Sequence, residues 1–160
     1  MEENRNTVRV RAPRGIFPAR VDDKGRLKLP AAFKSFLEQL EEKDVFVSSF
    51  DGRIARIYTG PAWDKTEIYL NQSGDDFEIR EKLYHLSMHY GADSRMDDQG
   101  RILINSELRR EMGVENSPVK VMFFDGVIQV WGDAVDQEKL AVARTVQPDQ
   151  LKNEERKGLR

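Results

Sequence analysis

The chain has 160 residues, of which 39% are hydrophobic and 34% are charged, and its formal net charge at neutral pH is -2. This balance is typical of a folded globular protein and argues against a disordered chain. No apolar run approaches the roughly 18 residues of a membrane helix, so we expect no membrane-spanning segment. The chain has no cysteine, which excludes disulfides and thiolate metal sites and favours a reducing compartment. The N-terminal stretch MEENRNTVRVRAPRG lacks an apolar segment, so we expect no secretory signal and a cytoplasmic location.

Two stretches of the sequence each occur twice. RVDDKGRLKLP (20–30) is matched by RMDDQGRILIN (95–105) at an offset of 75 positions, and FDGRIARIY (50–58) is matched by FDGVIQVW (124–131) at an offset of 74. Two matches in the same order at nearly the same spacing indicate an internal duplication. The difference of one residue falls in a connection, where insertions are tolerated.

The first copy predicts two strands, a helix and a hairpin in that order. The strands IFPARV and RLKL flank the turn DDKG, in which Asp22 and Gly25 are typical turn residues. Pro30 suits a helix start. One helical face then carries the apolar residues Phe33, Phe36, Leu37 and Leu40. Two further strands around Asp51-Gly52 predict a hairpin with a two-residue turn.

The second copy repeats this order. The turn DDQG, with Asp97 and Gly100, precedes the strand RILI and a helix over 106–112 that ends at Gly113. Asn105 stands where the first copy has Pro30 and can cap this helix. A hairpin around the second FDG closes the copy.

Helices are also predicted outside the two copies. PAWDKTEIYLNQ and DDFEIREKLYHLSMHY lie between them, the latter with Ile79, Leu83, Leu86 and Tyr90 on one face. DAVDQEKLAVART follows the second hairpin, and the polar stretch VQPDQLKNEERKGLR is predicted to be a frayed tail.

These segments divide the chain into six parts. They are an N-terminal extension (1–13) that carries Arg5, Arg9 and Arg11 and whose role is open, a first repeat (14–60), a helical connection (61–91), a second repeat (92–132), a C-terminal helix (133–145) and a polar tail (146–160). Each half has too little apolar surface to fold alone, so we expect the two halves to complete one β-rich core with helices outside it.

Several of these motifs resemble those of one family. Arg14-Gly15, followed after six residues by DDKGRLKLPAAF, resembles the opening of the MraZ family of bacterial transcriptional regulators. DDQGRILINSELRREMGV and FDGVIQVW are similar to the second copy and closing strand of that family, so the resemblance covers about 14–131. The chain departs from the family pattern in two places. Asn105 stands where a proline is common in the second copy, and residues 1–13 extend the chain ahead of the usual start.

The resemblance implies both a fold and a function. The fold is α+β and β-rich, with two AbrB-like β-α-β-β repeats that form a pseudo-dimeric swapped-hairpin barrel with peripheral helices. The implied function is sequence-specific binding of repeated promoter boxes in double-stranded DNA by a ring-like homo-oligomer. Such a regulator represses its own division and cell-wall gene cluster and is associated with the nucleoid.

Charge is distributed unevenly between the two copies. Residues 14–34 contain six basic and two acidic side chains, whereas 93–111 contain four basic and five acidic ones. Regular strand alternation would place Lys24, Arg26 and Lys28 on one side. Lysine and arginine neutralise DNA phosphates, and arginine also recognises guanine edges. We therefore predict DNA contacts by Arg26 first, then Lys24, Lys28 and Arg20, with Arg101 as the counterpart in the second copy, and by Arg14.

Other interpretations stay open at this point. Asp22 and Arg26 can pair across the turn, which would make the repeated motif a structural clamp, and Lys24 and Lys28 can be ordinary solvated lysines of an edge strand. The alternative function is an AbrB-fold protein-interaction or antitoxin-like module whose basic strip binds an acidic protein.

The sequence offers little support for an enzyme. His85 and His89 are spaced like metal ligands on a helix, but the glutamate of the H-E-x-x-H motif is missing. The Asp pairs belong to turns, and no Walker loop, dinucleotide-binding glycine pattern or nucleophile elbow occurs. We predict no catalytic residues, no cofactor, no metal site, no small-molecule substrate and no membrane partner. Trp63 and Trp131 are predicted to be packing residues.

Overall fold

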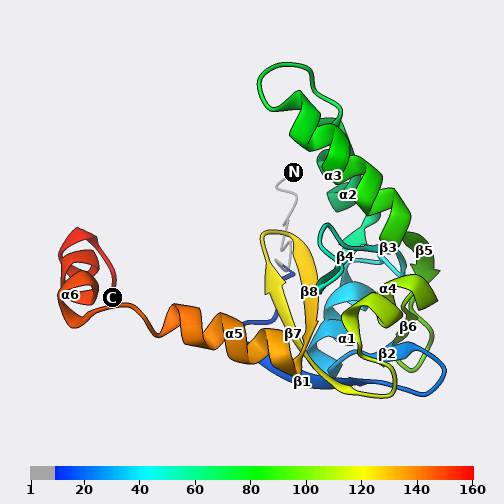
Figure 1. Cartoon of the computed structure of the whole chain (residues 1–160). Coiled ribbons are helices and arrows are strands. Elements are labelled where there is room, and N and C mark those ends of the chain that lie inside the picture. Colours follow the sequence, from blue (N-terminus) through cyan, green and yellow to red (C-terminus); the bar gives the residue numbers. More distant parts are fainter. Residues whose placement is uncertain (1–9) are drawn as a thin grey trace, which may run out of the picture.

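Fourteen helices and strands follow one another along the chain in the computed structural model, which describes residues 10–160 (Figure 1). Most of the predicted extension, with Arg5 and Arg9, therefore lies outside the described residues. The strands are β1 (Ile16–Val21), β2 (Arg26–Lys28), β3 (Asp44–Ser48), β4 (Ile54–Thr59), β5 (Ala92–Arg95), β6 (Arg101–Leu103), β7 (Pro118–Phe124) and β8 (Val127–Gly132). The helices are α1 (Ala31–Gln39), α2 (Gly60–Leu70), α3 (Phe77–Tyr90), α4 (Ser106–Met112), α5 (Asp133–Ala143) and α6 (Pro148–Lys157).

All eight strands form one antiparallel sheet in the order β5-β3-β4-β8-β7-β1-β2-β6. The two edge strands, β5 and β6, are consecutive in the chain and are joined by the DDQG turn, so the sheet comes close to closing into a barrel. This architecture confirms the predicted α+β, β-rich fold class.

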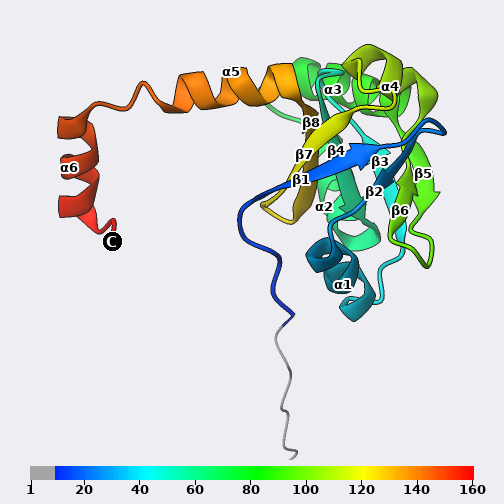
Figure 2. The ribbon, with the colours of Figure 1, turned by 90° about the horizontal axis from the view of Figure 1, so that it is seen from below.

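The strand register shows that the two copies exchange strands: β1 lies beside β7, and β5 lies beside β3 (Figure 2). Ala19 of β1 lies opposite Val119 of β7, and Ser94 of β5 lies opposite Val45 of β3. Ser94 is the repeat equivalent of Ala19, and Val119 is the repeat equivalent of Val45. The two pairs are therefore equivalent, with the copies exchanged. The first strand of each copy therefore pairs with the third strand of the other, as in a swapped-hairpin dimer.

The core is assembled from equivalent positions of the two copies. Leu27 of β2 lies opposite Ile102 of β6, and the side chains of both are fully buried. Phe33 of α1 and its equivalent Leu108 of α4 are likewise fully buried. Because each half contributes one wall of a shared core, neither half can bury its apolar side chains without the other.

The two hairpins have different turns. In the second, Asp125 and Gly126 have φ of 51° and 84° and form the expected two-residue turn. In the first, five residues separate β3 from β4, so the prediction of a two-residue turn was wrong. The hydroxyl of Ser49 explains the wider loop, because it donates to the carbonyl of Ile54 at 2.7 Å and accepts from the amide of Gly52 at 3.0 Å.

Two helical segments extend away from the barrel (Figure 1). In the α2–α3 hairpin, Ile79, one of the four residues expected on a common helix face, is 56% exposed because it lies near the free end of the hairpin. The tail forms helix α6 and is not frayed, since Gln147 and Gln150 make a reciprocal capping box at its start. Among residues 10–160, no helix combines the length and apolarity needed to cross a lipid bilayer.

Candidate nucleic-acid interface

Each D-x-x-x-R motif closes its own turn through the aspartate. Asp22 Oδ1 accepts the backbone N–H groups of Lys24 and Arg26, both at 2.9 Å, and Asp22 Oδ2 accepts Nε–H of Arg26 at 3.0 Å. Asp97 binds Arg101 in the same way, with its Oδ2 at 2.7 Å from Nε. The pairing across the turn that the sequence left open is thus present in both copies.

The hydrogen bonds of these turns lower the pKa of both aspartates. The backbone N–H of Arg26 is the largest cause for Asp22, and the backbone N–H of Arg101 is the largest for Asp97. Partial desolvation raises each pKa but is outweighed by the hydrogen bonds and by the adjacent guanidinium. Both carboxylates are therefore ionised at neutral pH and keep the turns closed.

Strands β1, β2 and β6 are neighbours in the sheet (Figure 2), and three cations, one from each strand, lie in one row across them. Arg20 of β1 lies opposite Lys28 of β2, and Lys28 lies opposite Arg101 of β6. Directly opposed residues point to the same face, with Cβ atoms about 5 Å apart. The intervening Leu27 and Ile102 point into the core, so this cationic row (Arg20, Lys28 and Arg101) lies on the outer face of the barrel.

The other predicted contacts lie at different distances from the cationic row. Arg26 is on the same face as Lys28, and Lys24 is exposed in the turn just before β2 and not on a strand. Arg14 is also exposed but precedes the far end of β1, which places it roughly 20 Å from Arg20. The structure thus brings five of the six predicted residues together and leaves Arg14 apart.

Cations of the second copy are more fully neutralised than those of the first. Arg95, the equivalent of Arg20, forms an ion pair with Asp44 at 2.8 Å. Arg20 instead donates to the carbonyl and the side-chain oxygen of Asn116, which carry no net charge. Gln99 stands in place of Lys24, and Leu103 in place of Lys28. The positive surface therefore belongs mainly to the first turn and to the row beside it.

Sequence reasoning missed two cations that lie behind the turns. Arg109 of α4 is next to Gly25, and Lys34 of α1 is next to Gly100. These two residues occupy equivalent positions of the two copies, 75 positions apart. That shared charge in the repeat was the available signal, but the cross-copy contact could not be seen without the strand exchange.

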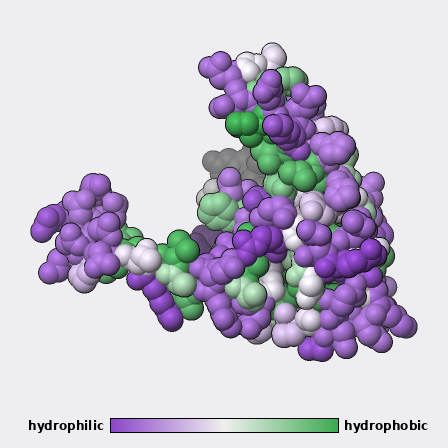
Figure 3. All heavy atoms as spheres, in the orientation of Figure 1, coloured by the Kyte–Doolittle hydropathy of each residue, from purple (hydrophilic) through white to green (hydrophobic). Residues whose placement is uncertain are grey.

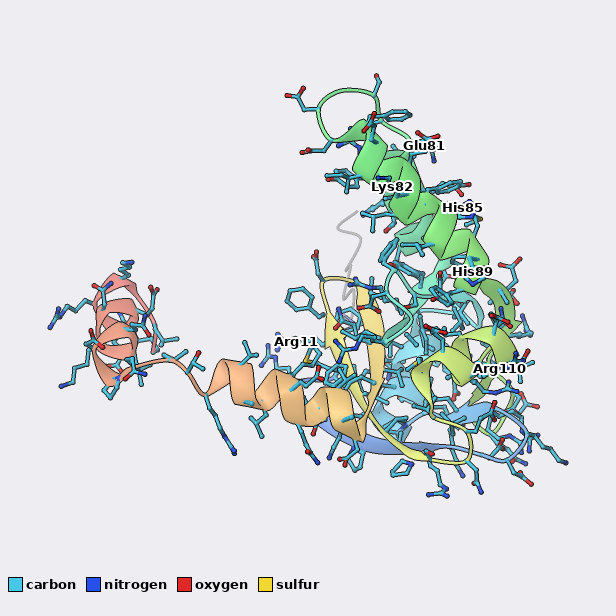
Figure 4. The ribbon with its side chains drawn as sticks, viewed as in Figure 1. Arg11, Glu81, Lys82, His85, His89 and Arg110 are labelled. Carbon is cyan, nitrogen blue, oxygen red and sulfur yellow. The ribbon has the colours of Figure 1, made fainter. Side chains whose placement is uncertain are left out.

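The predicted packing residues and the two histidines have clear surroundings. Trp131 is 1% exposed, and the ring of Trp63 lies 4.4 Å from that of Phe46, so both tryptophans pack as predicted. His85 and His89 lie exposed along α3 (Figure 4), and Nε2 of His89 is 4.0 Å from Glu107. Within residues 10–160, no group of three histidine, aspartate or glutamate side chains is placed to hold a metal ion.

The chain is similar to several curated proteins, although no protein-family model matches it. The Transcriptional regulator MraZ of Koribacter versatilis is 39% identical over 112 residues, which are 69% of this chain and 76% of the relative. The protein of the same name from Acidobacterium capsulatum is 39% identical over 106 residues, 66% of this chain and 73% of the relative. That of Proteus mirabilis is 24% identical over 140 residues, 84% of this chain and 92% of the relative.

Proposed function

Because the chain belongs to the MraZ family of transcriptional regulators, we propose that it regulates transcription by binding double-stranded DNA, without enzymatic activity. The cationic row and the adjoining Lys24 and Arg26 form its DNA-contacting surface.

The observation that carries this proposal is the alignment of like charges in the cationic row. Like charges directly opposite each other on a sheet repel and destabilise it, and partner carboxylates normally relieve such repulsion. Among residues 10–160, no carboxylate forms an ion pair with Arg20 or Lys28. A polyanion would relieve this repulsion, and a row about 10 Å long spans several phosphates of a duplex.

Arg26 and Arg101 combine both interpretations of the motif. Each uses its Nε–H to bind the aspartate of its own turn, and about 30% of each side chain is exposed. The terminal NH groups of Arg26 make no hydrogen bond to residues 10–160. The aspartate therefore orients the guanidinium, and the terminal groups are the ones available for a phosphate or a guanine edge.

A salt titration tests this proposal directly. The duplex is the region upstream of the gene for this chain, and its affinity is measured by fluorescence anisotropy between 50 and 200 mM salt. The proposed surface has five cations: Arg20, Lys24, Arg26, Lys28 and Arg101. If each neutralises one phosphate, a plot of the logarithm of affinity against the logarithm of salt concentration has a slope of roughly -4.5 per subunit. Lys28→Gln should reduce the magnitude of the slope by about 0.9.

The matched control is Lys82→Gln, which removes an exposed lysine from α3, away from the cationic row (Figure 4). It should leave the slope unchanged. No binding at the lowest salt would contradict the proposal and favour the alternative, an antitoxin-like module whose basic strip binds an acidic protein. Equal slopes for Lys28→Gln and wild type would remove the row from the DNA interface.

We also propose that the chain acts as a ring-like homo-oligomer through its C-terminal arm, the segment from α5 to α6. Figure 3 shows apolar side chains at the surface of this arm, and Val142 is 72%, Val146 60% and Leu151 46% exposed. A ten-residue helix such as α6 is marginal in isolation. Packing of the arm against a second copy would cover these residues, and a head-to-tail contact between identical chains gives a ring when the rotation between neighbours closes.

Oligomer formation would raise the affinity for repeated DNA boxes. Simultaneous engagement of several boxes increases avidity by roughly 10²- to 10⁴-fold without any new contact. Light scattering should show an oligomer for the full chain, a smaller species for a chain that ends at residue 145, and partial dissociation for Leu151→Asp. Asn153→Asp, at an exposed polar position of α6, is the matched control. A monomeric full chain contradicts this proposal.

The gene target follows from the family resemblance and is also a proposal. We expect repeated boxes in the promoter of its own division and cell-wall gene cluster, and repression of that cluster from the cytoplasm, where the protein associates with the nucleoid. A reporter fused to the upstream region should be more active in a deletion strain. Wild-type chain should restore repression, and Lys28→Gln should restore less of it. Equal reporter activity with and without the gene would contradict autorepression.

A further inference from the structure

We propose that Arg109 is a positioning residue for DNA binding: its guanidinium holds the DDKG turn of the other copy so that Lys24 and Arg26 are presented in a fixed geometry. The inference rests on the proposed DNA-binding function and names a residue that itself touches no DNA. It follows from a set of contacts between α4 and the first turn.

Arg109 of α4 is linked to the first turn through Ile104, which lies just before α4 in the same copy. Arg109 NH1 donates to the carbonyl of Ile104, and the N–H of Ile104 donates to the carbonyl of Gly25 at 3.0 Å. Arg109 Nε donates to Glu115 Oε1 at 3.2 Å. The guanidinium also lies directly behind Gly25, where a Cβ would overlap it. Gly25 is therefore enclosed by the guanidinium on one side and held by a hydrogen bond on the other.

The second turn lacks this arrangement. Lys34, the equivalent of Arg109, lies behind Gly100 with its Cδ 2.9 Å from the position that a Cβ would take. Its ammonium group pairs with Glu38 on its own helix at 3.0 Å. Leu29 N–H still donates to the carbonyl of Gly100 at 2.9 Å. The second turn is thus supported by an aliphatic chain, whereas the first is supported by a planar group with its own fixed partners.

Two independent differences between the copies therefore coincide in one turn. The turn that carries an exposed lysine, Lys24, is also the turn that the guanidinium supports, whereas the equivalent position of the other turn is Gln99. Groups that are already ordered lose less conformational entropy when they bind, so support from behind raises affinity. Arg109 is only 14% exposed and already bound to Glu115, so it acts through the turn.

Arg109→Met tests the inference, with Lys34→Met as the matched control in the other copy. Arg109→Met should lower DNA affinity about tenfold, because a turn that is no longer held from behind loses more conformational entropy when it binds. Its salt slope should stay at the wild-type value, because no phosphate contact is lost. Lys34→Met should have a clearly smaller effect. In a Lys24→Gln, Arg26→Gln background, Arg109→Met should cause little further loss, which general destabilisation of the fold would not explain.

Amide hydrogen exchange provides a readout that needs no DNA. Arg109→Met should accelerate exchange at Lys24 and Gly25 but not at Gln99 and Gly100. Glu115→Gln, which removes only the anionic partner of Arg109, should show the same pattern more weakly and covers the case in which Arg109→Met does not fold.

Three results overturn the inference. They are an Arg109→Met variant that binds DNA with wild-type affinity, a salt slope of this variant that is smaller than the wild-type slope by about one unit, and an equally large loss of affinity when Arg109→Met is added to Lys24→Gln, Arg26→Gln. Absence of DNA binding by the wild-type chain would instead contradict the proposed function.

Discussion

Truncation of Leu27 is expected to destabilise the whole barrel, because this side chain lies where the two copies meet. Leu27 is fully buried and lies directly opposite its own equivalent, Ile102, across the β2–β6 pair. Leu27→Ala removes three carbon atoms, each worth about 0.8 kcal/mol of transfer free energy. Because two strands of different copies frame the site, we expect little collapse and a cavity cost in addition.

The expected loss is therefore about 3 kcal/mol of unfolding free energy, within the range for buried leucines. For a chain of 160 residues this corresponds to a fall in melting temperature of roughly 6 to 12 °C. Urea unfolding, followed by tryptophan fluorescence at fixed protein concentration, measures the loss. Leu103→Ala is the matched control, since Leu103 is 52% exposed on the adjacent strand and should change stability by less than about 0.5 kcal/mol.

The pair of equivalents also predicts coupling. Leu27→Ala and Ile102→Ala share one cavity, so the double variant should differ from the sum of the single variants by at least about 0.5 kcal/mol. A loss below about 1 kcal/mol for Leu27→Ala would refute the reasoning that the two halves depend on one core. Two separate unfolding transitions, one for each half, would refute it equally.

Three further predictions concern a pH dependence, a turn and a buried indole. Because the folded-state pKa values of Asp22 and Asp97 lie below the ordinary 3.8, their stabilising effect should be fully present above about pH 5. The difference in unfolding free energy between wild type and Asp22→Asn or Asp97→Asn should therefore shrink as pH falls below about 4 through the folded-state pKa. Urea unfolding at several pH values measures this difference. A difference that does not change with pH would show that the ionised carboxylates do not stabilise the turns. Gly126→Ala should lower the free energy of unfolding by about 1 kcal/mol because Gly126 has a φ of 84°, while no atom crowds the position of the added Cβ. Thermal unfolding measures this loss, and an unchanged melting temperature would show that the turn relaxes. Asp136→Ala should lower the free energy of unfolding by about 1 to 2 kcal/mol, because the buried indole N–H of Trp131 loses its acceptor, which lies at 2.9 Å. Asp136→Asn keeps an acceptor oxygen and should be close to wild type in urea unfolding. Similar losses for both variants would show that this hydrogen bond is not the cause.

Interactions between residues close in the chain were visible in the sequence. Asp22 and Asp97 bind amides two and four positions ahead, Asn105 caps the helix that starts at the next residue, and Gly113 ends it with a φ of 68°. The repeat was visible for the same reason, since the residues that make these local interactions occur in both copies. The capping box of α6 is also local, but the polar composition of the tail obscured it.

Contacts between the two copies were decided only by the tertiary structure. The second strands of the two copies, β2 and β6, pair with each other, and this pairing places Arg101 beside Lys28 and Arg20. Arg109 of the second copy lies behind Gly25 of the first. The same repeat is compatible with two hairpins that each pair within their own copy. In the observed pairing Leu27 and Ile102 are fully buried opposite each other, and the apolar faces of both halves are removed from water in one shared core, which is a long-range effect that no local pattern of residues specifies.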